Sequence, residues 1–182
     1  PSGKELWLEL SGDFHNNGTW TPARSYIVSQ KNQTISQAKG KEFTGIINKA
    51  GVDVSADTFN LIAASDITIN AQSFNGNGSK DGEYFWGKID MKGYNLVLRG
   101  GTSFTKTIVT NVDTFSCLDS STASSITVEK AVTLGGRFTV TDANVTFNGN
   151  VTVSDTLQNG GNLGWVTPKF KGKLTNKGLI RN

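Results

Sequence analysis

The sequence predicts an all-β protein whose chain coils into a β-solenoid, a parallel β-helix in which successive turns stack on one another. Three observations support this prediction. Short apolar-x-apolar triplets recur at even spacing, turn-forming residues separate them, and no stretch has the apolar periodicity of a helix. The 182 residues suit one domain, so we expect a single solenoid over residues 1–182 that belongs to a larger protein.

Composition favours strands and turns over helices. Glycine is frequent, with 21 residues against 3 prolines, and Asn, Thr and Ser fill most polar positions. The best helical candidate, Ile35–Lys49, is interrupted by Gly40 and Gly45, so we expect almost no helix. No apolar run is long enough to cross a bilayer, and Pro1–Gly3 lacks the zones of a signal peptide. We therefore expect an excised or mature piece with no membrane insertion in this segment.

The main repeat begins at Ile126, where the chain falls into units of about six residues. Each unit starts with an apolar-Thr-apolar triplet. Alternate residues of a strand share one face, so the outer two should point inward and the threonine, which tolerates water, outward. The expected inward pairs are Ile126/Val128, Val132/Leu134, Phe138/Val140, Val145/Phe147 and Val151/Val153.

Turn formers such as Gly-Gly and Asn-Gly-Asn separate these triplets, and strands this short fit a coil of stacked rungs better than hairpins. Three units give a rung of roughly 18 residues, and the chain should form about eight to ten rungs stacked about 4.8 Å apart. Similar triplets at Val52–Ala56 and Asp66–Asn70 extend the pattern into the first half.

A second repeat, apolar-x-Asn-x-Gly-x-apolar, occurs at Phe14–Trp20, Leu157–Leu163 and Leu174–Ile180. Asn followed two positions later by Gly suits a tight corner, because both residues accept positive φ. The last two copies lie 17 positions apart, which is close to the predicted rung. The repeat therefore predicts corners between strands.

Five segments resemble repeats of large surface proteins, especially those of Bacteroidota: GDFHNNGTW (12–20), NQTIS (32–36), INKAGVDVSAD (47–57), ITIN (67–70) and KGYNLVLRGG (92–101). Residues 55–71 are also similar to filamentous-haemagglutinin-type repeats. The resemblance covers roughly two-thirds of the chain. It implies a right-handed parallel β-helix, secretion, and a role in adhesion or surface structure.

Residues 76–89 depart from the triplet pattern, so we expect an irregular loop or a bulged rung there. This segment holds a candidate glycan site, because exposed aromatic rings stack on sugars and nearby carboxylates hydrogen-bond to hydroxyl groups. The alternative is that its aromatic residues, like Trp20 and Trp165, cap the core or fill a wide rung. The tentative ligand-binding residues are Tyr84, Trp86, Asp81 and Glu83.

Catalysis is a more distant alternative, because some polysaccharide lyases and hydrolases are parallel β-helices. A hydrolase needs two carboxylates at a fixed separation, whereas the aspartates here occupy turn or strand-end positions. We therefore expect no catalytic residue and no enzyme activity. The residues considered are the acids Asp53, Asp57 and Asp66 and the isolated bases Arg99 and Arg137.

No metal or cofactor site is expected. His15 is the only histidine and lies in a turn-like segment, and Cys117 is the only cysteine, so no usual zinc site or Ser-His-Asp arrangement is supported. Cys117 shares its alternating face with Phe115, which predicts a buried apolar role. Paired glycines without a phosphate-loop signature are expected at corners: 100–101, 135–136 and 160–161.

Charge is unevenly placed although the net charge is only +3. No acidic residue follows Asp155, and in residues 169–174 lysines occupy one strand face while Phe170 and Leu174 occupy the other. This stripe either binds an acidic polysaccharide or lipid headgroup, or protects an exposed strand edge, which we favour. The basic residues are Lys169, Lys171, Lys173, Lys177 and Arg181.

We therefore expect a non-catalytic, extracellular structural or adhesive module of a bacterial surface protein. Its partners would be a host or environmental glycan, a surface protein or neighbouring modules of the same chain, and we expect no nucleic-acid partner. Neither Leu6–Leu10 nor Gly178–Asn182 carries a capping helix, so both ends should be unfinished. The alternatives are a carbohydrate-binding module on a β-helix and a polysaccharide lyase or hydrolase.

Overall fold

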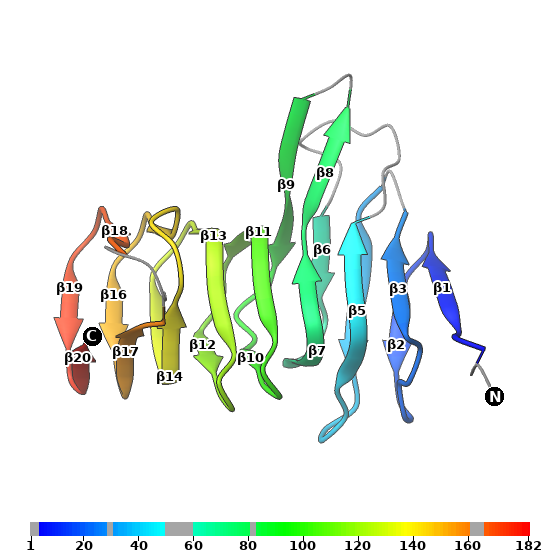
Figure 1. Ribbon diagram of the computed structural model, residues 1–182, viewed down its shortest axis with the longest axis horizontal. Helices are drawn as coiled ribbons and strands as arrows, with labels where there is room; N and C mark the ends of the chain where they lie inside the picture. Colours follow the sequence, from blue (N-terminus) through cyan, green and yellow to red (C-terminus); the bar gives the residue numbers. More distant parts are fainter. Residues whose placement is uncertain (1–3, 29–30, 50–59, 81–82, 161–165) are drawn as a thin grey trace.

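The chain winds into a β-solenoid of about seven turns (Figure 1). The computed structural model describes residues 4–28, 31–49, 60–80, 83–160 and 166–182. Within these ranges the chain forms 20 strands and no helix, and every strand pairing but one is parallel. The all-β fold and the parallel solenoid predicted from the triplets are thereby confirmed.

Three parallel faces run along the solenoid, and each turn of the chain visits face 1, face 2 and face 3 in that order. The strands of face 1 are β1 (Trp7–Leu10), β3 (Arg24–Ile27), the second half of β5 (Phe43–Lys49), the second half of β7 (Ile67–Asn75), the first halves of β11 (Ser103–Thr110) and β13 (Thr122–Val128), the second half of β14 (Val132–Val140), β17 (Thr156–Asn159) and β20 (Leu179–Arg181).

Faces 2 and 3 use the remaining strands and the other halves of the long ones. Face 2 consists of β2 (Phe14–Asn16), β4 (Gln33–Gln37), β6 (Asn60–Ala63), β9 (Glu83–Asp90), the second halves of β11 and β13, β15 (Thr146–Phe147) and β18 (Lys169–Phe170). Face 3 consists of the first halves of β5, β7 and β14, with β10 (Leu96–Leu98), β12 (Thr114–Cys117), β16 (Val151–Val153) and β19 (Leu174–Asn176).

The turns are 19 residues long in the middle of the chain, where Leu96 pairs with Phe115 and Phe115 with Leu134. This length is close to the predicted rung. Turns are longer in the first half, where Phe74 pairs with Phe104, 30 positions later. In that turn the additional residues include the hairpin of β8 (Asn77–Lys80) and β9, and the parallel pairing on either side of it is retained. The longer turns explain why the chain forms about seven turns rather than the eight to ten predicted.

The corners use the residues that the sequence analysis assigned to them. Gly18 and Gly178 each donate their backbone N–H to the side-chain Oδ1 of the asparagine two residues earlier, at 3.1 and 3.0 Å. The expected reason was wrong, because neither glycine has a positive φ, and the asparagine side chain forms the corner instead. The predicted 17-residue offset between the last two copies is wrong as a rung, because Leu157 pairs with Ile180, 23 positions later. Gly136 has a φ of 59° inside β14, where the chain bends from face 3 to face 1.

The interior is continuous along the solenoid. All of the predicted inward residues between Ile126 and Val153 are at most 5% exposed, as the triplet pattern requires. Phenylalanines from different faces form a column in which neighbouring ring centroids are 5.0 to 6.2 Å apart. The column contains Phe74, Phe104, Phe115, Phe138, Phe147 and Phe170.

The departure from the triplet pattern at residues 76–89 is a hairpin. Strand β8 (Asn77–Lys80) pairs antiparallel with the first part of β9, and this hairpin projects from the rod (Figure 1). The end of β9 returns to the solenoid, because Gly87–Asp90 pairs in parallel with β11. The insertion therefore extends one turn without breaking the stack.

Cys117 is fully buried in β12 beside the column, as predicted from its position two residues after Phe115. Burial raises the pKa of the Cys117 thiol to about 12, and a hydrogen bond from the Thr139 backbone offsets this only in part. The raised pKa favours the folded state below the pKa of an unfolded cysteine, and this contribution is lost as the pH rises toward 12.

We expect a thiol-reactive dye at about pH 8 to leave folded Cys117 unlabelled, because the thiolate is the reactive form and here the thiol is protonated and buried. Unfolding in denaturant should give complete labelling. The matched control is Cys117→Ala with Leu118→Cys, since Leu118 is 38% exposed at the adjacent corner and a thiol there should react in the folded state. Equal labelling rates for folded and unfolded Cys117 would contradict the burial.

Candidate functional site

Three of the residues predicted to bind a glycan, Glu83, Tyr84 and Trp86, lie in the β8–β9 hairpin. Asp81 is outside the described residues. Glu83 and Tyr84 pair through their backbones with Lys80 and Ser79, so they belong to one antiparallel ribbon. Trp86 pairs with Asn77 and is half-buried. Trp20, the other described candidate aromatic, packs against Phe14 and Phe43 at the N-terminal end of the core, whereas Trp165 is outside the described residues.

Asp66, a candidate acid, is bound to the backbone of the next turn. Its Oδ1 accepts the Asn95 N–H at 2.9 Å, and Asn95 Oδ1 in turn accepts the Thr114 N–H at 3.2 Å. These three residues lie at the starts of stacked strands of face 3: Asp66 just before β7, Asn95 just before β10, and Thr114 at the first position of β12. The two hydrogen bonds therefore link three successive turns at one corner. Asp53 and Asp57 lie outside the described residues.

The other charged candidates lie at corners too. Arg99 contacts Asp119 at 3.4 Å, and both side chains are exposed. Arg137 is exposed at the start of the second half of β14. Asp90, not singled out from the sequence, accepts hydrogen bonds from the Lys92 backbone and from Asn111. Burial raises its pKa, but hydrogen bonds from Lys92 and Asn111 outweigh this and hold the pKa of Asp90 below its usual value.

His15 is exposed, as expected, but it lies in strand β2 rather than in a turn. Its Nδ1 is hydrogen-bonded to Ser36 Oγ on the paired strand β4. Among the described residues, no group of three or more His, Cys, Asp or Glu side chains is placed to hold a metal ion. None of the described residues forms a helix long and apolar enough to span a membrane.

An exposed aromatic cluster lies on the first two turns of face 1. Trp7 is 57% exposed, and its ring centroid is 6.0 Å from that of Tyr26. The Arg24 guanidinium carbon is 5.1 Å from the Trp7 ring, and Trp7 Nε1 donates to Glu5 at 3.0 Å. Sequence analysis placed Trp7 in a strand-like segment but gave it no role, because its partners lie one turn later in the chain.

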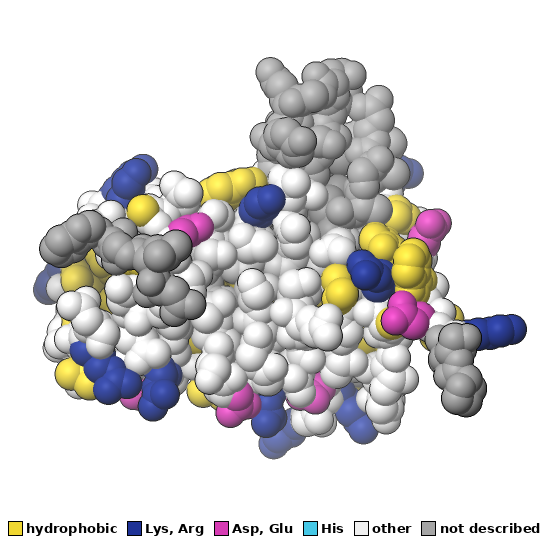
Figure 2. Space-filling model, viewed as in Figure 1, with side chains coloured by type: hydrophobic (Ala, Val, Ile, Leu, Met, Phe, Trp, Pro, Cys, Tyr) yellow, Lys and Arg dark blue, Asp and Glu magenta, His cyan; other side chains and the backbone are white. Residues whose placement is uncertain are grey.

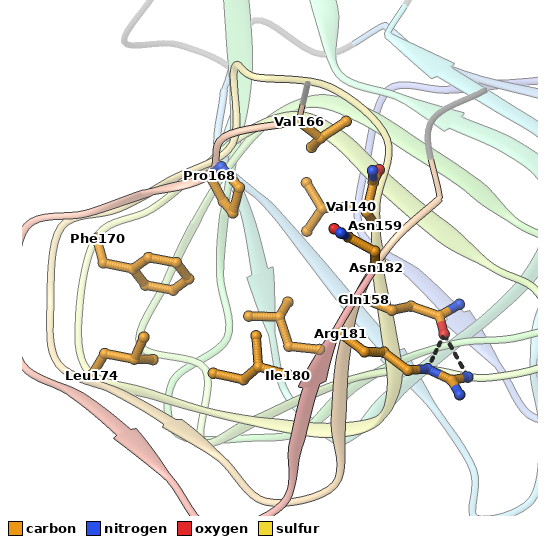
Figure 3. A pocket seen from close by; sticks show the side chains of 11 residues that line it. Val140, Gln158, Asn159, Val166, Pro168, Phe170, Leu174, Ile180, Arg181 and Asn182 are labelled. Carbon is orange, nitrogen blue, oxygen red and sulfur yellow. Dashed lines mark hydrogen bonds between the residues drawn. The ribbon is translucent and has the colours of Figure 1, made fainter. Parts of the chain in front are cut away.

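The C-terminal end of the solenoid, formed by β18, β19 and β20, opens into a cavity of about 350 Å³ (Figure 3). Phe170, Leu174 and Ile180 line it from these three strands. Leu174 and Ile180 occupy inward positions but are 40% and 45% exposed, because no further turn covers them in the described structure. At its edge, Arg181 donates two hydrogen bonds to Gln158 Oε1 (Figure 3).

Charge differs between the two ends. Figure 2 shows Lys and Arg side chains gathered at the C-terminal end, and both acidic and basic side chains beside apolar ones at the N-terminal end, which is formed by β1 and β2. Lys169, Lys171 and Lys173 are exposed at the C-terminal end. The predicted division of residues 169–174 is confirmed only in part. Phe170 and Leu174 line the cavity while the lysines are exposed, but these residues belong to two strands, β18 and β19, rather than to one.

These features define the class of protein as a parallel β-solenoid with apolar residues exposed at both ends. No protein-family model matches the chain, and neither a curated protein nor a solved structure shows significant similarity to it. The solenoid is therefore shown by the strand pairing itself.

We expect Asp66→Ala to lower the free energy of unfolding by about 1 kcal/mol, because the Asn95 N–H loses its acceptor at a partly exposed corner. Asp66→Asn retains Oδ1 and should cost less than half as much. Urea unfolding followed by circular dichroism measures both. Equal losses for the two variants would show that the negative charge, rather than the acceptor, holds the corner.

Proposed function

We propose that the protein is a non-catalytic structural and adhesive module of an extracellular bacterial surface protein. The observation that supports it best is the unbroken stack of about seven turns, with a phenylalanine column from Phe74 to Phe170 in its interior. Such a rod presents a long hydrophilic surface while its length depends only on the number of turns. The segments that resemble repeats of surface proteins favour the same function.

The positions of the candidate acids also favour a structural role. A hydrolase requires two carboxylates that flank one substrate bond at a fixed separation. Asp66 instead accepts a backbone N–H of the next turn, and Asp119 contacts Arg99 and the Gly100 N–H. The proposed partners are a glycan or surface protein along the rod and neighbouring modules at its ends.

We expect protease treatment of intact source cells to remove the module's epitope, because the proposed location is outside the cell. The purified chain should release no unsaturated or reducing products from pectin-like or alginate-like polymers. An epitope that is protected until the cells are lysed would contradict the location. Polymer cleavage that is lost in Asp66→Asn, with the fold retained, would contradict the non-catalytic function and favour a lyase or hydrolase.

A second candidate function is carbohydrate binding, favoured by two aromatic positions outside the closed part of the core. Trp86 lies on the projecting hairpin, and Trp7 is exposed beside Tyr26 and Arg24. Aromatic rings of this kind stack on the apolar faces of sugars, and neighbouring polar groups bind the hydroxyls.

If the module binds glycans, we expect Trp86→Ala to weaken binding on a glycan array by about tenfold, since losing one stacking ring removes on the order of 1 kcal/mol or more. Trp7→Ala is the matched variant, because it removes the other aromatic site. Loss of binding only in Trp7→Ala would assign the site to the N-terminal end. No glycan binding by the unmodified chain would remove this second candidate.

A further inference from the structure

A groove of about 720 Å³ lies on the outer side of face 3, in the middle of the solenoid. Its floor consists of outward residues from three paired strands, because Val97 in β10 pairs with Thr68 in β7 and with Ser116 in β12. All three residues are half-buried. Described strands flank the floor on both sides, since β7 also pairs with β5 and β12 with β14. We call this surface the face 3 groove.

A second row of polar groups borders the floor of the face 3 groove. Asp66, Asn95 and Thr114 line it at the starts of the same three strands. Asp66 and Asn95 each use Oδ1 to bind the backbone of the next turn, so Asp66 Oδ2 and Asn95 Nδ2 have no partner among the described residues. The hydroxyls of Thr114, Thr68 and Ser116 also lack one there. The groove therefore offers both donors and acceptors to a ligand.

One wall of the face 3 groove is the turn that follows β4. In this turn the Lys41 N–H donates to Ala38 O at 3.0 Å, and Gly40 has a φ of 75°. Gln37 joins the wall to the floor, because its Nε2 donates to Lys41 O at 2.6 Å and its Oε1 accepts the Thr68 N–H at 3.1 Å. Gln37 is only 8% exposed. The wall is therefore held in place before a ligand binds, which lowers the entropy cost of binding.

The construction of the groove disfavours a peptide or a nucleic acid as its ligand. An extended peptide binds a sheet by pairing with a free strand edge, whereas β10 is paired with β7 on one side and β12 on the other. Among the described residues that line the groove, only Lys39 and Asp66 are charged, and their charges are opposite. The groove therefore lacks the excess of positive charge that binds phosphates.

The spacing of the polar groups favours a linear polysaccharide. Successive turns are about 4.8 Å apart, and the two rows, which are two residues apart on each strand, are separated by about 6.7 Å. The distance between turns is close to the length that one pyranose unit adds to an extended glycan chain. A glycan along the rod would therefore meet the same arrangement of polar groups at each sugar. Val97, in the middle of the floor, provides an apolar contact for the C–H groups of a ring.

We propose that the face 3 groove binds a linear polysaccharide of neutral pyranose sugars, which lies along the rod with about one sugar per turn. Sugar hydroxyls donate to Asp66 Oδ2 and accept from Asn95 Nδ2, and Thr68 and Ser116 bind further hydroxyls from the floor. This inference deepens the proposed function, because it names the class of the glycan partner and the surface that binds it. The site is on a different face from Trp7.

Affinity electrophoresis tests the inference with neutral polymers. The chain carries a net charge of +3, so it migrates toward the cathode, and an uncharged polymer in the gel retards it only by binding. We expect retardation by at least one of hydroxyethyl cellulose, arabinoxylan and galactomannan. Retardation by none of them overturns the proposal. That result would leave the protease test of surface location unaffected, so the two failures are distinguishable.

Removing hydroxyls from the floor tests the surface. Thr68→Ala with Ser116→Ala should weaken binding of the retarding polymer by about tenfold, because two hydrogen bonds to the ligand are lost. The fold should be retained, since neither hydroxyl has a partner among the described residues. Circular dichroism checks this.

The matched control is Thr127→Ala with Thr146→Ala, which removes two paired, half-buried hydroxyls from face 2. It should bind the polymer like the unmodified chain. Equal weakening by the two pairs would overturn the proposal.

The aromatic variants separate this site from the second candidate function. Trp7→Ala and Trp86→Ala should bind the retarding polymer like the unmodified chain, because neither residue lines the face 3 groove. Loss of binding in either variant, with binding retained in Thr68→Ala with Ser116→Ala, would overturn the proposal and assign the binding to the aromatic residue.

Chain length tests the alignment of the glycan along the rod. Isothermal titration calorimetry with oligosaccharides prepared from the retarding polymer should show an affinity that rises by about tenfold or more from the disaccharide to the tetrasaccharide. Longer oligosaccharides should gain little, because the floor spans only three turns. An affinity that is the same for two and four sugars would overturn the proposed alignment.

Discussion

The backbone hydrogen bonds between successive turns are the interaction on which the rest of this structure depends. Each parallel strand obtains its partners from the turns before and after it, so equivalent positions lie directly above one another. Most inward positions are then apolar in turn after turn, with exceptions such as Ser25, and the corners use acceptors or glycines. The phenylalanine column and the Asp66–Asn95–Thr114 corner are consequences of this stacking.

The interior could be predicted from sequence where the turns are regular. Alternation within each triplet is a local signal, so the burial of Val132, Leu134 and Cys117 followed from it. The number of residues in a turn is not a local signal, because residues inserted at a corner change the length of the turn without changing the alternation in the strands on either side. That is why a spacing of 17 between Leu157 and Leu174 was mistaken for one turn, when Leu157 in fact pairs with Ile180.

Less of the candidate site could be predicted from the sequence, because its contacts join residues of different turns and the length of a turn is not a local signal. Asp66 is recognisable as a corner acceptor only when its partner Asn95, 29 positions later, is known to lie in the next turn. Trp7 likewise gains its neighbours Arg24 and Tyr26 through strand pairing. Sequence alone identified the hairpin segment with Trp86 as different from the repeats, because there the alternation itself changes.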